Sequence, residues 1–204
     1  MPRWVSRYML AALLVVLAPA SQSFAQEQAQ SAVPPNARYQ GIDPQGHFKA
    51  IIPAPLRSLG HQKISKDGRL WATSHRRFAS FGNEISLVFG VLEFTNQLAI
   101  NMQILDADPL GVLMEDDAEA FLAAMGKTFN ITDIQTFRAF GTRAAQIKAR
   151  SLVEDDPRPH LIMYVVPYPD SMVVTFMGAA TPELLQGSEA QDFNRSFEAF
   201  EQPR

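Results

Sequence analysis

Apolar positions are densest from Glu84 to Phe94 (EISLVFGVLEF), where both faces that a β-strand would present are apolar. One face would carry Ile85, Leu87, Phe89 and Val91, and the other Val88, Leu92 and Phe94. A strand with water on one side alternates apolar and polar residues, whereas a strand covered on both sides does not. The run therefore predicts a central strand in a sheet that has a layer on each face.

Strand-like runs before and after this stretch predict an antiparallel meander. HFKAII (47–52) comes first and ends at Pro53, and two further runs flank Asp67-Gly68, a preferred hairpin turn. Turns at Gly82-Asn83 and Asn96 join the central run to its neighbours in sequence. We therefore expect the strand that contains Trp71 and the strand 98–104 to lie beside it.

The apolar period changes from two to about 3.6 in residues 115–127, which predicts a helix with an acidic first turn. Four strand-like runs follow, at 131–140, 144–153, 160–168 and 171–180. The chain then closes with a predicted helix that begins near Thr181-Pro182, breaks at Gly187-Ser188 and carries Phe193, Phe197 and Phe200.

These elements predict an α+β fold, a mainly antiparallel β-sheet with helices packed on it. The connections between strands are too short for crossover helices except at 115–127. Because the central run needs a cover on each side, we expect the helix at 115–127 and the C-terminal helix on opposite faces of the sheet.

The first 25 residues have the pattern of an export signal. Arg3 and Arg7 precede an apolar core, Met9 to Leu17, and Ser23-Phe24-Ala25 fits the small-x-small cleavage pattern. We expect cleavage before Gln26, a retained signal anchor being the alternative, and no membrane-spanning segment after removal of the signal. Residues 26–45 are predicted to be a flexible tether and residues 46–202 a single domain.

Composition excludes several functions. The chain has no cysteine, so it has neither a lipid-anchoring lipobox nor disulfides. Removing the signal changes the net charge from −3 to −5, because it takes away two arginines and no acidic residue. With no basic run beyond the pair Arg76-Arg77, this charge argues against nucleic-acid binding.

Candidate catalytic and metal sites are weak. No nucleophile elbow, phosphate-binding glycine loop or dinucleotide fingerprint occurs, and the spacing of His47, His61, His75 and His160 fits no zinc motif. The segment 106–117 imitates a calcium loop, but leucine and methionine stand at two of its ligand positions. We therefore predict no catalytic residue, no metal site and no cofactor.

One candidate ligand site lies on the predicted strand Arg69 to Ser80, where Trp71, His75 and Arg77 share a face by the period of two. An indole, an imidazole and a guanidinium together could recognise an anionic or glycan-like ligand. The alternative is a solvated face on which Trp71 packs under a neighbouring segment and Arg77 pairs with an acid.

Two segments carry a resemblance to a known group: HFKAIIPAP near the start of the domain and DFNRSFEAF near its end. Over roughly residues 46–200 the chain resembles the PsbP-like and DcrB-like proteins, in which an early strand runs into an Ile-Pro turn and the last helix ends near a Ser-Phe pair, here Ser196-Phe197. The resemblance implies an α/β/α sandwich and an accessory or binding role, and it brings no catalytic signature. The missing lipobox cysteine departs from the lipoprotein members.

Together these observations predict an exported protein, periplasmic or secreted, that acts on another envelope protein or a small ligand without catalysis. Two alternatives stay open. One is a small exported hydrolase with His75 or His160 as its base, which would need a Ser, Asp or Glu beside that histidine in a pocket. The other is a carrier of an apolar envelope lipid, which would need a long apolar tunnel.

Overall fold

A computed structural model describes residues 37–63, 72–94, 129–168 and 171–200. Several predictions fall outside these residues and stay predictions: the export signal, the Asp67-Gly68 turn, Trp71, the strand 98–104, the segment 106–117 and the helix 115–127.

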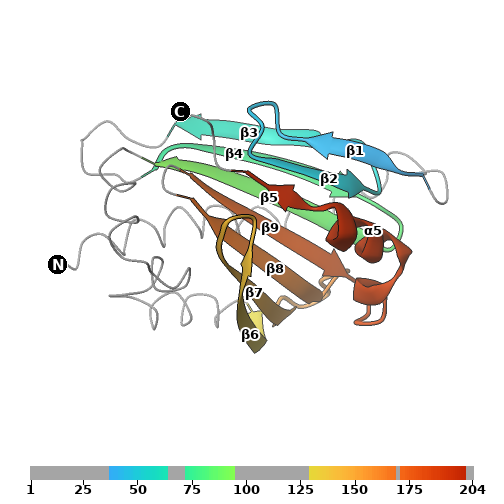
Figure 1. The fold of residues 1–204 in the computed structure, drawn as a ribbon. Helices are drawn as coiled ribbons and strands as arrows, with labels where there is room; N and C mark the ends of the chain where they lie inside the picture. The colour runs from blue at the N-terminus through green and yellow to red at the C-terminus, as the bar shows by residue number, and fades with distance from the viewer. Residues whose placement is uncertain (1–36, 64–71, 95–128, 169–170, 201–204) are drawn as a thin grey trace.

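The described chain forms two antiparallel sheets (Figure 1), which confirms a mainly antiparallel β fold. The order of the seven-stranded sheet is β3 (Arg57–Lys63), β4 (Ala72–Phe81), β5 (Ile85–Phe94), β9 (Ser171–Ala179), β8 (His160–Pro167), β7 (Thr142–Ser151) and β6 (Phe129–Ala139). The order of the three-stranded sheet is β1 (Tyr39–Ile42), β2 (Phe48–Ile52) and β10 (Glu198–Ala199).

Strand β5 is central, as its two apolar faces predict. Phe89 pairs with Phe78 of β4 on one side and with Thr175 of β9 on the other. The pairing with β4 confirms the predicted hairpin through Gly82-Asn83. The predicted pairing with residues 98–104 is wrong, because β9 occupies the second edge of β5 along its whole length. Sequence proximity favoured the meander, but the observed partner comes from about 80 residues further along the chain.

One face of the large sheet is covered by the three-stranded sheet and by α5 (Ser188–Ser196), which follows a short 3-10 helix, η1 (Leu184–Gln186) (Figure 1). The ring of Phe48 from β2 stacks on Phe89 with 4.4 Å between centroids, and Phe193 of α5 meets Phe89 edge-on at 6.0 Å. Full burial of such a ring contributes about 2–3 kcal/mol to stability. This layer is therefore held by an aromatic core.

The C-terminal helix breaks where it was predicted to break, and α5 begins at Ser188. It is shorter than the aromatic pattern suggested. Phe193 lies in the helix, but Phe197 caps its end and Phe200 lies beyond β10, so the predicted three-residue helical stripe is wrong. No helix in the described ranges is long and apolar enough to cross a membrane.

The opposite face of the large sheet is equally apolar. Its buried side chains on β5, β9, β8, β7 and β6 include Val88, Leu92, Phe129, Ala145, Ile147, Met163, Val165, Val174 and Phe176. Among the described elements, α5 and the three-stranded sheet both pack on the Phe89 face. The helix predicted for the second face lies outside the described residues, so its position stays a prediction.

Strand β1 lies inside residues 26–45, which were predicted to be a tether. It pairs with β2, and Gly41 packs so closely that a Cβ there would lie 2.7 Å from Cδ1 of Ile52. Asp43, just after the strand, is buried. The folded part therefore begins by Tyr39. A strand this short, with few large apolar residues, gives no period-two signal in the sequence.

Candidate functional site

The structure places two of the three predicted ligand-binding residues. His75 pairs with Leu92 and Arg77 with Gly90, so both lie on β4 beside the central strand, as the predicted hairpin requires. Arg77 is half-buried and is engaged in an interaction of its own. Trp71 lies outside the described residues. A ligand-binding role for these three residues stays a prediction.

A cluster of four charged or ionisable residues, which we call the Asp43 cluster, lies on the other face of β4 beneath the three-stranded sheet. It consists of Asp43, His47, Arg76 and Glu93. The side chains of Asp43, His47 and Arg76 are 0%, 3% and 8% exposed, and that of Glu93 is 29% exposed. The sequence did not predict this cluster, because the period of two places Arg77, and not Arg76, on the face of Trp71 and His75.

The guanidinium of Arg76 joins the cluster together. Its Nη1 donates to Oδ1 of Asp43 at 2.7 Å and its Nη2 to Oε1 of Glu93 at 3.0 Å. The second oxygen of Asp43 lies 2.8 Å from Nδ1 of His47 and accepts the backbone N–H of the same histidine at 3.1 Å. We assign the imidazole proton to Nδ1, because a carboxylate can only accept there.

The local sequence Asp43-Pro44-Gln45-Gly46-His47 brings the first two members together. It forms the turn between β1 and β2, in which the backbone N–H of Gly46 donates to the carbonyl of Asp43 at 2.8 Å. Gly46 has φ of 82°, a conformation that glycine adopts without steric cost. The carbonyl of His47 also accepts the backbone N–H of Phe200, which ties the C-terminal segment to this turn at 2.8 Å.

Burial raises the pKa of Asp43, but the hydrogen bonds from His47 and the positive charge of Arg76 outweigh it, so the pKa of this carboxyl lies below its ordinary value. Asp43 is thus a buried carboxylate held by charged partners.

An Asp–His pair of this geometry can serve as a general base, but a substrate must reach the imidazole, and the side chain of His47 is buried. Arg76 also fills the space between the carboxylates, and nowhere in the described chain do three metal-ligating side chains converge.

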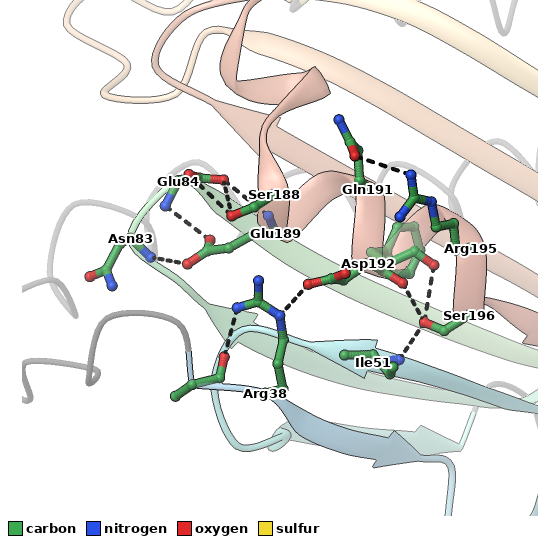
Figure 2. Close-up of polar contacts among 12 residues, drawn as sticks. Arg38, Ile51, Asn83, Glu84, Ser188, Glu189, Gln191, Asp192, Arg195 and Ser196 are labelled. Atoms are coloured by element: carbon green, nitrogen blue, oxygen red, sulfur yellow. Dashed lines mark hydrogen bonds and ion pairs between the residues drawn. The ribbon is translucent and has the colours of Figure 1, made fainter.

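A second buried carboxylate, Glu189, joins α5 to the turn between β4 and β5 (Figure 2). It accepts the backbone N–H groups of Asn83 and Glu84 at 3.1 and 2.9 Å, and that of Ile85 at 3.0 Å. The carboxylate of Glu84 in turn accepts the backbone N–H of Glu189 at 3.0 Å. Gly187 at the N-cap of α5 has no side chain, so Glu84 supplies the cap from another element. This anionic cap occupies the N-terminus of the helix.

Arg158, from the loop between β7 and β8, completes this junction. Its Nη2 donates to the carbonyl of Gly82 at 2.8 Å. Burial lowers the pKa of Arg158, and the negative charge of Glu189 opposes that shift. Gly82 has no room for a side chain, because a Cβ there would overlap both Glu189 and Pro53. The turn, the loop and the helix therefore fit together at one glycine.

The two segments that carried the family resemblance are also ties between layers. Ser80 of β4 accepts the backbone N–H of Ala54, just after the Ile-Pro turn, at 3.0 Å and donates to the carbonyl of the same residue at 2.7 Å. Ser196 accepts the backbone N–H of Ile51 at 2.6 Å (Figure 2), and Phe197 packs in the core. An ion pair between Arg38 and Asp192 adds to this contact (Figure 2). Both segments therefore have a structural role, because they join layers of the fold.

The other histidines differ from His47. His61 is exposed on β3, and His160 is half-buried at the start of β8. The pKa of Glu183 is lowered mainly by a hydrogen bond from Thr181, with a smaller contribution from His160. The side chain of His75 lies outside the described part of the structure.

Comparisons with known proteins find similarity in structure alone. No protein-family model matches the chain, and no curated protein matches it in sequence. The structure is similar to the solution structure of cyanobacterial PsbP (CyanoP) from Synechocystis sp. PCC 6803, with a TM-score of 0.47 and 12% identity over 84% of this chain and 96% of that one. It is more distantly similar to a crystal structure of a protein from Bacteroides thetaiotaomicron VPI-5482, with a TM-score of 0.31 and 8% identity over 80% of this chain and 48% of that one.

The resemblance predicted from HFKAIIPAP and DFNRSFEAF thus has a counterpart among solved structures. Similarity at this level does not bear on function.

Proposed function

We propose that this chain is an exported, non-catalytic binding or accessory protein of the cell envelope. The observation that supports the proposal most is the state of the Asp43 cluster. The Asp–His pair with the geometry of a general base is buried and engaged by Arg76, and it holds three parts of the fold together. A group that a substrate cannot reach stabilises the fold but does not catalyse.

The hydrolase alternative has less support. It requires His75 or His160 beside a Ser, Asp or Glu in a pocket. His160 pairs with Ala179 and Arg150 across the neighbouring strands, and its effect on Glu183 is electrostatic. The described contacts of His160 do not place a nucleophile beside it.

The lipid-carrier alternative would draw on the second face of the sheet, which is apolar at its centre and carries Arg77 on β4. The described cavity on that face has a volume of about 10 Å³ and is lined by Phe129, Ile147, Ala149, Leu161, Met163 and Phe176. That volume suits one water molecule and is far too small for an acyl chain. We infer that the apolar centre of this face, and not Arg77 or the exposed part of β6, is covered by the helix predicted at 115–127, which would complete an α/β/α sandwich.

We propose that the ligand binds the face of β4 that was predicted from the sequence. Trp71, His75 and Arg77 would present an indole, an imidazole and a guanidinium to an anionic or glycan-like group, or to an envelope protein that carries one. Arg77 lies next to Arg76 in β4, so the Asp43 cluster would fix the strand that presents it.

The proposal is tested by affinity capture of the tagged full chain from the envelope of its expression host, followed by protein identification and by extraction of lipids and small molecules. We expect one partner or ligand in near-stoichiometric amount, lost from Trp71→Ala/Arg77→Ala and retained by the control Arg57→Ala/Arg150→Ala. Both control positions are exposed arginines on other strands.

Turnover of a panel of chromogenic esters that is lost in His160→Ala or His75→Ala would contradict the non-catalytic proposal. Fractionation and N-terminal sequencing test export separately. A chain that begins at Gln26 in the periplasm or medium supports it, and a chain that stays in the cytoplasm contradicts it.

A further inference from the structure

Strand β6 exposes side chains on both of its faces, and its outer edge pairs with none of the other described strands. In the described part of the large sheet, β6 is the last strand and pairs with β7 along Phe129–Ala139. Residues 134–138 are all exposed although they alternate between the two faces of the sheet. Ile134 and Phe137, on opposite faces, are each 37% exposed. Both faces of this strand are therefore accessible, and no other described strand pairs with its outer edge.

Both ends of this edge are fixed. Phe129 is buried at the start, and the turn Phe140-Gly141 closes the hairpin with positive φ angles of 57° and 76°. Such a pair of angles suits a two-residue hairpin turn, but an aromatic residue rarely adopts it. Here the ring of Phe140 packs edge-on against Phe197 at 5.5 Å, and its carbonyl accepts the hydroxyl of Tyr168 at 3.1 Å. The edge is thus held in an extended conformation before anything binds it.

The other outer strand, β3, is protected in the ways that natural sheet edges commonly are. Its register is interrupted between Ser58 and Gly60, and it exposes the charged side chain of Arg57, as β6 exposes that of Arg138. Strand β6 has its interruption between Ile131 and Asp133, and its register then runs unbroken to Ala139. The two edges of the sheet are therefore not equivalent.

We propose that a second copy of this chain pairs with β6 edge to edge, so that one antiparallel sheet continues across a two-fold axis. An unpaired strand edge exposes a row of N–H and C=O groups, and another extended strand is what satisfies them. This inference does not depend on the ligand or on the absence of catalysis proposed above.

The sequence of β6 is compatible with pairing to itself. A two-fold axis normal to the sheet brings residues of the same face together, so it passes through a residue near the centre, Gln135 or Thr136. With the axis at Gln135, Asp133 of one copy faces Phe137 of the other. With the axis at Thr136, Asp133 faces Ala139. Arg138 correspondingly faces Thr132 or Ile134. Neither register brings like charges opposite each other, and the centre is an uncharged hydrogen-bonding residue, which favours cross-strand pairing.

The test is sedimentation velocity of the purified full chain over a range of concentrations, where we expect a monomer–dimer equilibrium. Thr136→Lys places a lysine at or beside the axis in both copies, and the dimer dissociation constant should rise at least about tenfold. The matched control, Ser58→Lys, adds the same charge to the exposed edge of β3 and should leave the equilibrium unchanged.

Two proline variants at adjacent positions test whether backbone N–H groups of β6 form the interface. Consecutive N–H groups of an antiparallel strand point to opposite sides, so one of Gln135→Pro and Thr136→Pro removes an N–H from the free edge and the other removes one from the pairing with β7. We expect one variant to abolish the dimer while its thermal midpoint stays close to that of the wild type, and the other to lower the midpoint. A wild-type chain that is monomeric at every concentration, or a dimer that survives Thr136→Lys and both prolines, would overturn the proposal.

Discussion

Glu189 and Asp43 are both buried carboxylates that tie the smaller layer to the large sheet, but their partners differ. Glu189 is satisfied by three backbone N–H groups of one turn, whereas Asp43 depends on the side chains of Arg76 and His47 as well as on a backbone N–H. Backbone donors stay in place when a neighbouring side chain is changed. Substitution of any member disrupts the Asp43 cluster, so the two ties should respond differently to mutation.

The largest effect is expected from Arg76→Leu. It leaves Asp43 and the partly exposed Glu93 without their shared cation, and breaking a buried ion pair in this way costs about 3–5 kcal/mol of unfolding free energy. Urea unfolding followed by circular dichroism measures it. Arg150→Leu, at an exposed arginine of β7, should change stability by less than about 0.5 kcal/mol and serves as the control. Equal effects of the two substitutions would contradict the role of the cluster.

Glu189→Ala should come next, at about 3 kcal/mol, because three backbone N–H groups lose a charged acceptor and Arg158 loses its nearby negative charge. The matched substitution Gln191→Ala lies on the exposed side of the same helix. If both variants unfold at the same urea concentration as the wild type, the reciprocal cap of α5 does not contribute to stability.

The pH dependence of stability tests the ionisation of Asp43. The pKa of Asp43 is lower in the folded chain than in the unfolded one, so its contribution is complete above the unfolded-state pKa and is lost as the pH falls through the folded-state pKa. Asp43→Asn should therefore destabilise the chain by about 1–3 kcal/mol at pH 7 and by progressively less below about pH 4. Unfolding curves between pH 7 and pH 2.5 check this. A difference between the two proteins that grows on acidification would contradict the assigned ionisation.

The smallest effect concerns Ser196. Ser196→Ala removes the acceptor of the Ile51 N–H and should cost about 1 kcal/mol. Ser188→Ala, at an exposed serine of the same helix with longer contacts to Glu84, should cost less. Reversal of this order in thermal unfolding would show that the Ser-Phe pair of the family resemblance does not act through this hydrogen bond.

Much of the fold was predictable because apolar periodicity is a local signal. The runs at 47–52, 131–140, 144–153, 160–168 and 171–180 each contain one observed strand to within a few residues. Two-sided burial also identified β5 as central. Short strands such as β1 and β10 gave no such signal. The pairing of β5 with β9 could not be read from the sequence, since nothing local distinguishes a distant partner strand from a near one.

The candidate site was harder to predict than the fold. The Asp43 cluster joins positions 43, 47, 76 and 93, and its first member lies in a segment whose composition resembled a tether. In the strand LWATSHRRFAS the alternation separates Arg76 from Arg77, but it does not say which face is buried. A turn with the spacing Asp-x-x-Gly-His was the one usable hint, because such a turn brings a carboxylate and an imidazole to the same side.

The Asp43 cluster ties the smaller layer to the large sheet. A double-mutant cycle of Asp43→Asn and Arg76→Leu on the free energy of unfolding measures the coupling within it. We predict that the double variant is less destabilised than the sum of the single variants by about 1.5–3 kcal/mol, because removal of both charges avoids leaving one buried and unpaired. Effects that add without coupling would contradict this account.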